Sequence, residues 1–247
     1  MTTTLLQCTS PHVAVCSKSA FDSARLGSLS AAALMEWAAD RFGDSLVVST
    51  SFGIQSAVTL HLATQVNPTI PVIWVDTGYL PNETYRYAEQ LTSLLNLNLH
   101  VYQSEISAAR MEAMHGQLWE TDRETDYQLY DDLQKVEPLQ RAFKELQPLA
   151  WVSGLRSEQT GFRRTLKRVA FDGQRQKVLP ILHWTSKDIY EYMQQHSLPN
   201  HPMFELGYTT VGDWHSSRPP SSDDANDRAT RFRGLKEECG IHLPSRA

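Results

Sequence analysis

The stretch SLVVSTSFGIQSAVTLHLATQV, residues 45–66, contains the change of pattern that decides the fold. It opens with a short apolar run, continues through small polar residues to Gly53, and then shows helical spacing over 54–66. A buried strand, a tight turn and a helix in this order form the first half of a β-α-β unit. We therefore expect a strand within 45–53 whose carboxyl end carries hydroxyl groups and a glycine.

The alternation of apolar strands and helices continues on both sides of this stretch. Helical spacing covers 29–43 and 82–96. Near-continuous apolar runs, typical of strands that are buried on both faces, occupy 69–79, 97–103, 148–156 and 177–182. The sequence therefore predicts an α/β fold with an open, mostly parallel sheet and helices on both faces.

The segment 211–229 differs in composition from the rest of the chain. It is rich in Ser, Pro and Asp and has few apolar residues, which is typical of a mobile loop. We therefore divide the chain into an N-terminal arm (1–28), an α/β domain (29–210), and a mobile loop with a C-terminal tail (211–247).

Composition and charge exclude several classes of protein. The 247 residues are 41% hydrophobic with a net charge of −5, which is ordinary for a soluble globular protein and unsuited to coating nucleic acid. No apolar run is long enough to span a membrane. The three cysteines, Cys8, Cys16 and Cys239, form no CxxC pair and have no scaffold-like spacing. They indicate a reducing, cytoplasmic location.

The first strand ends in a pattern that favours an anion site. Ser49, Thr50 and Ser51 offer hydroxyl groups, and Gly53 allows backbone N–H groups to approach a ligand. The helix that follows presents its positive end to the same point. The alternative is a plain strand-to-helix turn.

The second strand ends in VDTGY, residues 75–79, with Asp76 at its tip. A carboxylate there could accept a hydrogen bond from a ribose hydroxyl or an adenine amino group. The alternative is that Asp76 caps the following turn.

The fourth strand leads into a basic segment, SGLRSEQTGFRRTLKR, residues 153–168. Guanidinium groups match the oxygens of phosphate or sulfate. The alternative is a solvated basic face. The cations of this segment are Arg156, Arg163, Arg164, Lys167 and Arg168.

Cys239 stands near the end of the chain, after a second group of cations. From the residues alone it could be a metal ligand, a disulfide partner, a spare thiol or a nucleophile. Nearby cations lower the pKa of a thiol and attract anionic substrates. The cations that precede it are Arg228, Arg231, Arg233 and Lys236.

The motifs STSFG, DTGY, GLRSEQ and ECGIH, in this order, resemble those of the thioredoxin-dependent phosphoadenylyl-sulfate (PAPS) reductases of the PAPS/APS reductase family. The resemblance covers about residues 45–243 and includes KVEPLQRA, KVLPI and HPMFELGYTTVGD. It implies an adenine nucleotide alpha hydrolase-like (ATP pyrophosphatase-like) fold. It also implies a nucleotide-binding domain over 29–210, a homodimer, and a place in sulfate assimilation and cysteine biosynthesis.

The resemblance implies that reduced thioredoxin, or glutaredoxin, converts PAPS to sulfite and adenosine 3′,5′-bisphosphate. Cys239 would be the catalytic nucleophile and would pass through an S-sulfonate. The substrate-binding residues would be Ser49, Thr50, Ser51, Phe52, Gly53, Ser56, Asp76, Thr77, Lys135, Gly154, Arg156, Arg163, Arg164, Arg231, Arg233, Lys236 and His242.

A sister group, the adenylyl-sulfate (APS) reductases, holds a [4Fe–4S] cluster with a Cys-Cys pair and a later Cys-x-x-Cys. In this chain the pairs would fall at about Tyr130 and Asp131, and at about Asp213 and Ser216. None of these is cysteine, and cluster ligation requires thiolates. We therefore expect no iron–sulfur cluster, no other bound cofactor or metal, and PAPS rather than APS as substrate.

Two other functions compete with this one. An adenylating enzyme of the ATP pyrophosphatase type would carry a loop closer to SGGxDS, in which Phe52 and Gln55 replace a glycine and an aspartate. A non-catalytic nucleotide-binding subunit would not need the terminal thiol.

Overall fold

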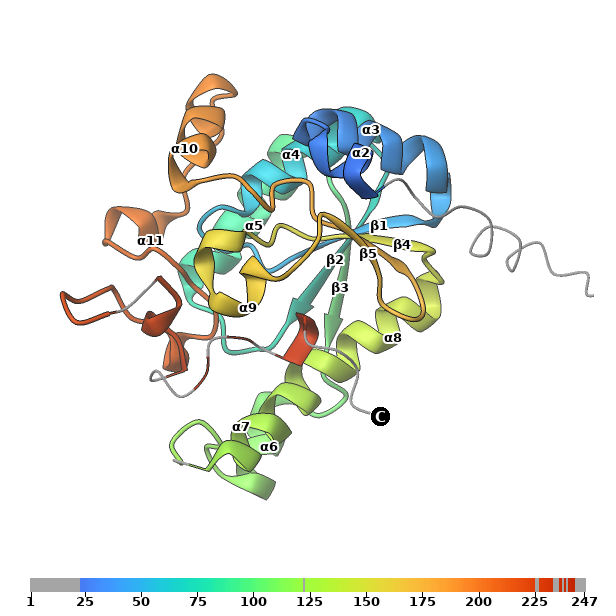
Figure 1. Ribbon diagram of the computed structural model, residues 1–247. Coiled ribbons are helices and arrows are strands. Elements are labelled where there is room, and N and C mark those ends of the chain that lie inside the picture. Colours follow the sequence, from blue (N-terminus) through green and yellow to red (C-terminus); the bar gives the residue numbers. More distant parts are fainter. Residues whose placement is uncertain are drawn as a thin grey trace, which may run out of the picture.

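The computed structural model describes residues 23–121, 123–224, 227–232, 236, 238 and 240–242. Six strands form one sheet in the order β3-β2-β1-β4-β6-β5 (Figure 1). The strands are β1 (Leu46–Thr50), β2 (Pro71–Asp76), β3 (Asn98–Gln103), β4 (Ala150–Val152), β5 (Val169–Phe171) and β6 (Gln176–Val178).

Helices connect and cover these strands. The longer ones are α3 (Ala31–Phe42), α4 (Ser56–Val66), α5 (Asn82–Leu95), α6 (Ala108–His115), α7 (Glu124–Asp131), α8 (Glu137–Leu146) and α10 (Ser186–Gln195). The shorter helices and turns are α2 (Ser23–Ser28), η1 (Gly43–Ser45), the π-helical turn η2 (Asp132–Val136), η3 (Ser157–Gln159), α9 (Gly161–Arg164), α11 (Pro202–Glu205), η4 (Trp214–Ser216), η5 (Asp227–Thr230) and η7 (Gly240–His242). No helix among these is long and apolar enough to cross a membrane.

The order of the strands creates the crevice in which ligands of such sheets bind. Strand β1 pairs in parallel with β2 on one side and with β4 on the other. Along the chain β1 is followed by β2, whereas β4, on the other side of β1, is reached from β3. The two connections therefore run in opposite directions across the sheet, and the carboxyl ends of β1 and β4 form the crevice where open α/β sheets bind ligands. Only β5, at the far edge, runs antiparallel to its neighbour, β6. The predicted open, mostly parallel sheet is confirmed.

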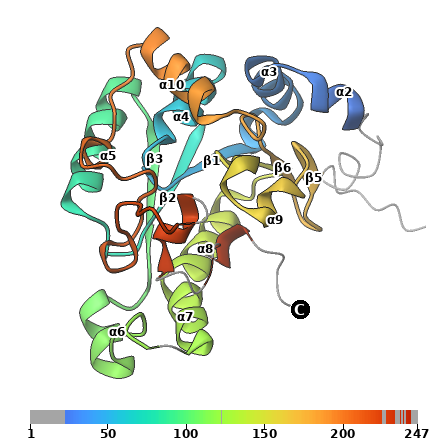
Figure 2. The same ribbon diagram turned by 60° about the vertical axis from the view of Figure 1, so that its left-hand side comes forward.

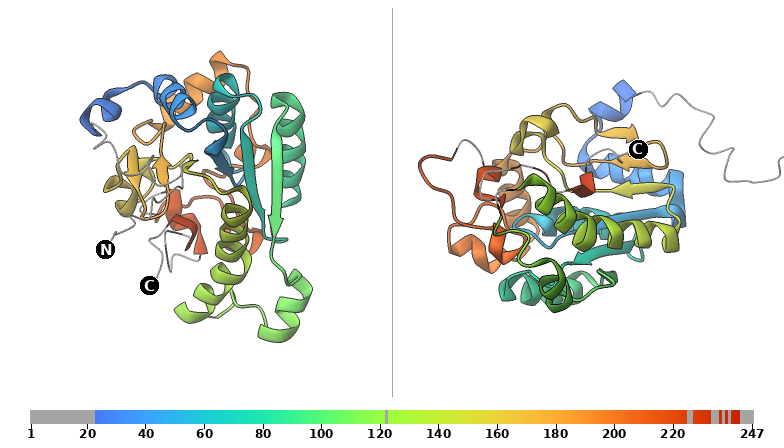
Figure 3. Two further views of the ribbon diagram at one scale, coloured as in Figure 1. Left: turned by 90° about the vertical axis from the view of Figure 1, so that its right-hand side faces the viewer. Right: turned by 90° about the horizontal axis from the view of Figure 1, so that it is seen from below.

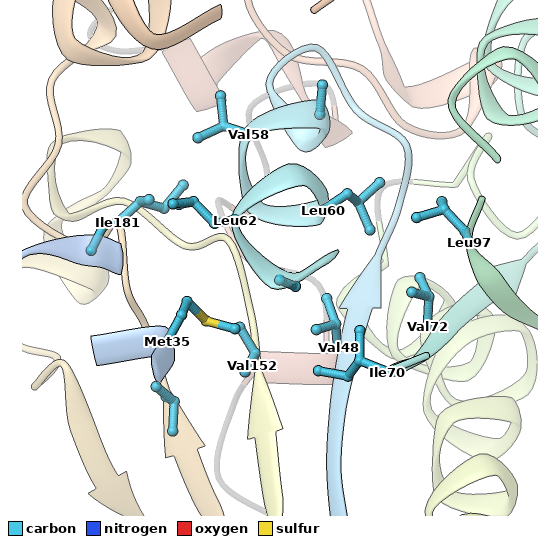
Figure 4. Packing of buried hydrophobic residues seen from close by; sticks show 14 of the residues in the cluster. Met35, Val48, Val58, Leu60, Leu62, Ile70, Val72, Leu97, Val152 and Ile181 are labelled. Carbon is cyan, nitrogen blue, oxygen red and sulfur yellow. The ribbon is translucent and has the colours of Figure 1, made fainter. Parts of the chain in front are cut away.

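Both faces of the sheet are buried because apolar residues alternate between two helical layers. Leu46 and Val48 of β1 pack into the core formed with α3, α4 and α5. Figure 4 shows Val48 in this core, with Leu60 of α4 nearby. Val47, between Leu46 and Val48, faces the opposite layer, where Leu139 and Phe143 of α8 pack. Figure 3 shows α5 and α8 on opposite sides of the strands. This alternation explains why the strand sequences are continuously apolar.

Two of the predicted strands are shorter than expected, and one strand was missed. The strand predicted over 148–156 pairs only over Ala150–Val152. The strand predicted over 177–182 ends at Val178 because the chain turns there, with Leu182 N–H donating to the Leu179 carbonyl at 3.3 Å. Strand β5 has three residues, too few for an alternating pattern to be recognised.

The two terminal segments that the sequence sets apart are in part packed against the body. Leu26, within the predicted N-terminal arm, lies in helix α2 and is buried in the core. In the predicted loop 211–229, Val211, Asp213 and Ser216 are buried. Polarity alone does not reveal this packing, because Asp213 and Ser216 are buried with hydrogen-bond partners.

Candidate active site

A cavity of about 230 Å³ lies at the carboxyl ends of β1, β2 and β4. The structure brings eleven of the predicted site residues together in its lining, although they come from distant parts of the sequence. These are Ser49, Thr50, Ser51, Gly53, Ser56, Thr77, Lys135, Gly154, Arg163, Arg231 and His242.

The turn from β1 to α4 forms one wall of the cavity. The backbone N–H of Phe52 donates to Thr50 Oγ1 at 3.0 Å, and the Ser56 hydroxyl donates to the Gly53 carbonyl at 2.8 Å. The Phe52 ring is fully buried and packs edge-on against Trp74, 4.9 Å between ring centroids. Phe52 is thus not among the lining residues. It anchors the turn that presents the neighbouring hydroxyl groups.

Lys135 lies at the centre of a buried ion network in the second wall. Its Nζ is 2.9 Å from Asp213 Oδ2 and 3.1 Å from Asp131 Oδ1. The π-helical turn η2 carries Lys135, while Thr77, at the end of β2, donates to Asp213 Oδ1 at 2.5 Å. Three separate segments therefore fix the position of one ammonium group.

The network also sets the charge of Asp213. Burial alone would raise the pKa of this carboxyl, but the positive charge of Lys135, then His215 and the Thr77 hydroxyl, holds its pKa well below the ordinary value. Asp213 is therefore ionised throughout the physiological pH range.

Aromatic rings surround the ammonium group of Lys135. It lies 4.8 Å from the centroid of Tyr130 and 5.1 Å from that of Phe232, within the range of a cation–π contact. Behind them, Trp119 stacks on His215 with centroids 4.0 Å apart. These rings exclude water from the network and strengthen its electrostatic interactions.

The arginines of the basic segment 153–168 lie in different environments. Arg163 lines the cavity, whereas Arg164 is exposed. Arg156 is buried outside the lining, pairs with Glu158, and donates to the Trp184 carbonyl at 3.2 Å. Arg168 donates to backbone carbonyls, including that of Pro180 at 2.6 Å. The structure thus brings one of the predicted arginines of this segment into the cavity.

Asp76 is occupied by hydrogen bonds that fix the β2–α5 connection. It accepts from Gly78 N–H at 2.9 Å, from the Tyr85 hydroxyl at 2.7 Å and from Gln103 Nε2 at 2.7 Å. It is not among the lining residues, so the capping alternative describes its contacts.

The C-terminal segment reaches the cavity through Arg231 and His242. Arg231 lies across Gly212, where an added Cβ would be 2.1 Å from its Nη2, and its Nε donates to the Ser216 carbonyl at 3.0 Å. A side chain at position 212 would displace this guanidinium group from the cavity wall.

His242 stacks on Trp151, with centroids 5.4 Å apart, and its Nδ1 lies 3.3 Å from Lys177 Nζ. Burial, and then the charges of Lys177, Arg163 and Arg228, hold its pKa well below the ordinary value. His242 is therefore neutral at pH 7 and can accept or donate a hydrogen bond at the cavity.

Of the other predicted residues of the tail, the structure describes Lys236 but not Arg233 or Cys239. Lys236 pairs with Asp131 and is not in the cavity lining. Cys239 and Arg233 lie outside the described residues, so their predicted roles stay predictions.

Sequence reasoning missed several lining residues. Thr59 lies three residues after Ser56 on the same face of α4, so helical spacing could have found it. Asp213 could have been found as well, because it occupies a position where the sister group has a cluster cysteine. Arg228 was noted among the cations before Cys239, and Gln159 ends the quoted motif GLRSEQ, but neither was predicted as a binding residue.

Comparison with known proteins covers most of the chain. Residues 45–219 match the family model of the phosphoadenosine phosphosulfate reductase domain. A phosphoadenosine 5′-phosphosulfate reductase of Synechococcus sp. is 58% identical over 89% of this chain and 95% of that protein. The Escherichia coli (strain SMS-3-5 / SECEC) protein of the same name is 48% identical over 89% of both chains.

Solved structures agree with this assignment. The crystal structure of the PAPS reductase from Candida auris, a phosphate complex, has a TM-score of 0.69 and 28% identity, and covers 82% of this chain and 98% of that one. The FMN adenylyltransferase of Candida glabrata, at 14% identity and a TM-score of 0.59 over 90% and 75% of the two chains, shares the fold alone. The predicted adenine nucleotide alpha hydrolase-like fold is thereby confirmed, and the chain belongs to the phosphoadenosine phosphosulfate reductase family.

Proposed function

We propose that this chain reduces PAPS to sulfite and releases adenosine 3′,5′-bisphosphate, as an oxidoreductase of assimilatory sulfate reduction. Reduced thioredoxin, or glutaredoxin, supplies the electrons. The observation that carries the proposal is the cavity at the carboxyl edge of the sheet, which offers hydroxyl groups, a helix amino terminus and cations to an anionic nucleotide in a chain of this family.

The charge of the cavity suits a ligand with several acidic groups. Among the residues that the structure describes, the lining carries four cations and one carboxylate, namely Lys135, Arg163, Arg228, Arg231 and Asp213. The apolar side chains of Leu60 and Val75, also in the lining, provide a surface for the adenine ring.

The proposed chemistry has two stages. The Cys239 thiolate attacks the sulfur of the sulfonate group, the bond from that sulfur to the phosphate oxygen breaks, and the electron pair leaves with adenosine 3′,5′-bisphosphate. The nearby cations offset the charge of the sulfonate oxygens, which otherwise repel an anionic nucleophile.

In the second stage a thiolate of the donor attacks the Cys239 sulfur of the S-sulfonate. The sulfur–sulfur bond breaks and sulfite leaves with the electron pair. The second donor thiol then attacks the mixed disulfide, which restores the Cys239 thiolate and leaves the donor as a disulfide.

The absence of cluster ligands supports PAPS rather than APS as the substrate. The positions expected for cluster cysteines hold Tyr130, Asp131, Asp213 and Ser216, all of them buried. Asp131 and Asp213 instead bind the Lys135 ammonium group. A carboxylate–lysine network has no thiolate to ligate iron, so we propose that the reaction uses no iron–sulfur cluster.

We also infer the setting of the reaction. Three cysteines without a scaffold spacing, and a reductant that is a dithiol, fit a reducing cytoplasm. As in the family, we expect a homodimer.

The experiment replaces Cys239 with serine and follows sulfite release from PAPS with reduced thioredoxin. We expect the unchanged protein to release sulfite from PAPS in preference to APS. Cys239→Ser should release none while still binding adenosine 3′,5′-bisphosphate. In the unchanged protein, PAPS added without reductant should leave an adduct of about 80 Da on Cys239, as a covalent intermediate requires.

The matched controls are Cys8→Ser and Cys16→Ser, which should turn over normally. Normal turnover by Cys239→Ser, or an adduct on another residue, would refute the nucleophile.

A further inference from the structure

Glu238, the residue before Cys239, is held in a buried ion pair. Its side chain accepts from Arg163 twice, with Nε 2.7 Å from Oε1 and Nη2 2.8 Å from Oε2. The hydroxyl of Thr160 donates to Oε1 at 2.8 Å. Glu238 is 8% exposed and Arg163 is 5% exposed. A bidentate pair of this kind fixes direction as well as distance.

The two residues that bind Glu238, Thr160 and Arg163, are themselves held by hydrogen bonds. Thr160 caps helix α9 and accepts from the backbone N–H of Arg163 at 3.1 Å. The remaining guanidinium nitrogen, Nη1, donates to the side chain of Gln159. Gln159 therefore holds the Arg163 guanidinium group in addition to Glu238. Figure 2 shows η7 (Gly240–His242), in red, beside α8.

The chain is also held on the other side of position 239. The backbone N–H of Gly240 donates to Asp131 Oδ2 at 3.2 Å. Ile241 packs against the cluster that contains Leu139 and Phe143. The residues before and after Cys239 are therefore attached to two different walls of the cavity.

A buried ion pair is weak evidence for stability, because desolvation offsets much of its Coulomb energy. Such a pair instead fixes the relative position of the two segments that carry its side chains. We propose that Glu238 is a positioning residue: through Arg163 and Thr160 it sets the place of the segment that carries Cys239. The inference rests on the proposed function only in naming Cys239 as the reacting group.

The alternative is that Glu238 occupies Arg163 in place of an anionic group of the substrate. The two cases differ in kinetics. Loss of a positioning contact lowers kcat and leaves KM unchanged, whereas loss of a competitor lowers KM.

The kinetic experiment compares Glu238→Gln with Glu191→Gln, an exposed carboxylate on α10 that pairs with Lys187. We expect Glu238→Gln to lower kcat for sulfite release by about 10–100-fold, since small misplacements of a reacting group have effects of this size. KM for PAPS and the Kd of adenosine 3′,5′-bisphosphate should stay within about twofold of the unchanged protein. Glu238→Asp, which keeps the charge, should recover part of the rate, and Glu191→Gln should behave as the unchanged protein.

A second experiment needs no substrate. In a Cys8→Ser/Cys16→Ser background, the rate at which iodoacetamide alkylates Cys239 reports how the segment is held. Glu238→Gln, Arg163→Gln and the double variant should each change this rate by about the same factor, threefold or more, because all three remove one interaction. Thr160→Val, which leaves the Arg163 pair, should have a smaller effect.

The outcomes separate the possibilities. A lower KM with unchanged kcat in Glu238→Gln, or additive effects of Glu238→Gln and Arg163→Gln on alkylation, would overturn the positioning role. If the unchanged protein released no sulfite from PAPS, the proposed function would fail, and the alkylation experiment would still decide whether Glu238 and Arg163 act as a pair.

Discussion

At the scale of single residues, Gly154 packs closely against Thr59 in the cavity wall. A Cβ added to Gly154 would lie 2.6 Å from Thr59 Oγ1, and this hydroxyl is buried with no hydrogen-bond partner in the part of the chain that the structure describes. Gly154 does not have a positive φ. The glycine is therefore required because the chain just after β4 packs closely on α4, and not because of its backbone conformation.

We predict that Gly154→Ala lowers the free energy of unfolding by about 1–3 kcal/mol, the usual cost of overpacking. Thr59→Ala in the same chain should recover a large part of this loss, because it removes the atom that the new methyl group meets. Urea unfolding of the two single variants and the double variant measures the coupling. Strictly additive effects would show that the contact does not carry the cost.

At the scale of elements, His201 joins α11 to α5. It is fully buried, its Nδ1 accepts from the backbone N–H of Met203 at 3.1 Å, and its Nε2 lies 3.0 Å from Thr84 Oγ1. Because Nδ1 accepts, the ring is neutral and donates through Nε2 to Thr84. Burial lowers its pKa to about 4, although Glu83 opposes the shift.

This pKa predicts a loss of stability in acid. The unfolded chain takes up a proton on His201 near pH 6.5, while the folded chain does so only near pH 4. The stabilisation is therefore complete above pH 6.5 and falls as the pH is lowered. Between pH 7 and pH 5 we expect His201 to account for about 2 kcal/mol of lost unfolding free energy.

Urea unfolding of the unchanged protein and of His201→Gln at pH 7 and pH 5 tests this value. The variant should be less stable at pH 7 but should lose about 2 kcal/mol less on acidification. An equal loss in both proteins would contradict the assignment. His100→Gln serves as the control, since His100 lies on the edge strand β3 and is only half-buried.

The elements that sequence predicted well are those with long apolar patterns. Strands β1 to β3 and helices α3, α4 and α5 lie within a few residues of the predicted ranges. The helices between Ala108 and Leu146 were missed, although α8 carries the helical spacing of apolar residues, with Leu139, Ala142 and Phe143 buried. Similarly, the hydroxyl-rich end of β1 was predicted from the change in pattern after Val48. The network of Lys135, Asp131 and Asp213 could not be predicted, because it joins segments about eighty residues apart in the sequence.

At the scale of the whole molecule, the charge of the cavity is opposite to that of the chain. The protein carries a net charge of −5, whereas the described lining contains more cations than carboxylates. The same composition that excludes a general binder of nucleic acid therefore permits a focused positive potential at one edge of the sheet. No average over the sequence reveals this contrast, since Arg163 and Arg231 reach the cavity from separate segments.

We predict that binding of adenosine 3′,5′-bisphosphate weakens about tenfold between 0.05 and 0.5 M NaCl, because salt screens the cations of the cavity. Isothermal titration calorimetry at several salt concentrations measures the slope. AMP, which has one phosphate fewer, should show a smaller slope. Equal slopes for the two nucleotides would show that the second phosphate does not lie among these cations.

The antiparallel pairing of β5 with β6 has a practical consequence. The turn that joins them, where Asp172 Oδ1 accepts from Gln174 N–H at 2.9 Å and Arg175 N–H at 2.8 Å, lies at the amino end of β6. The cavity lies at the carboxyl ends of the parallel strands, on the opposite rim. A fluorophore or affinity peptide could therefore be inserted between Gly173 and Gln174 to label or immobilise this enzyme. The opening of the cavity would face away from the insertion.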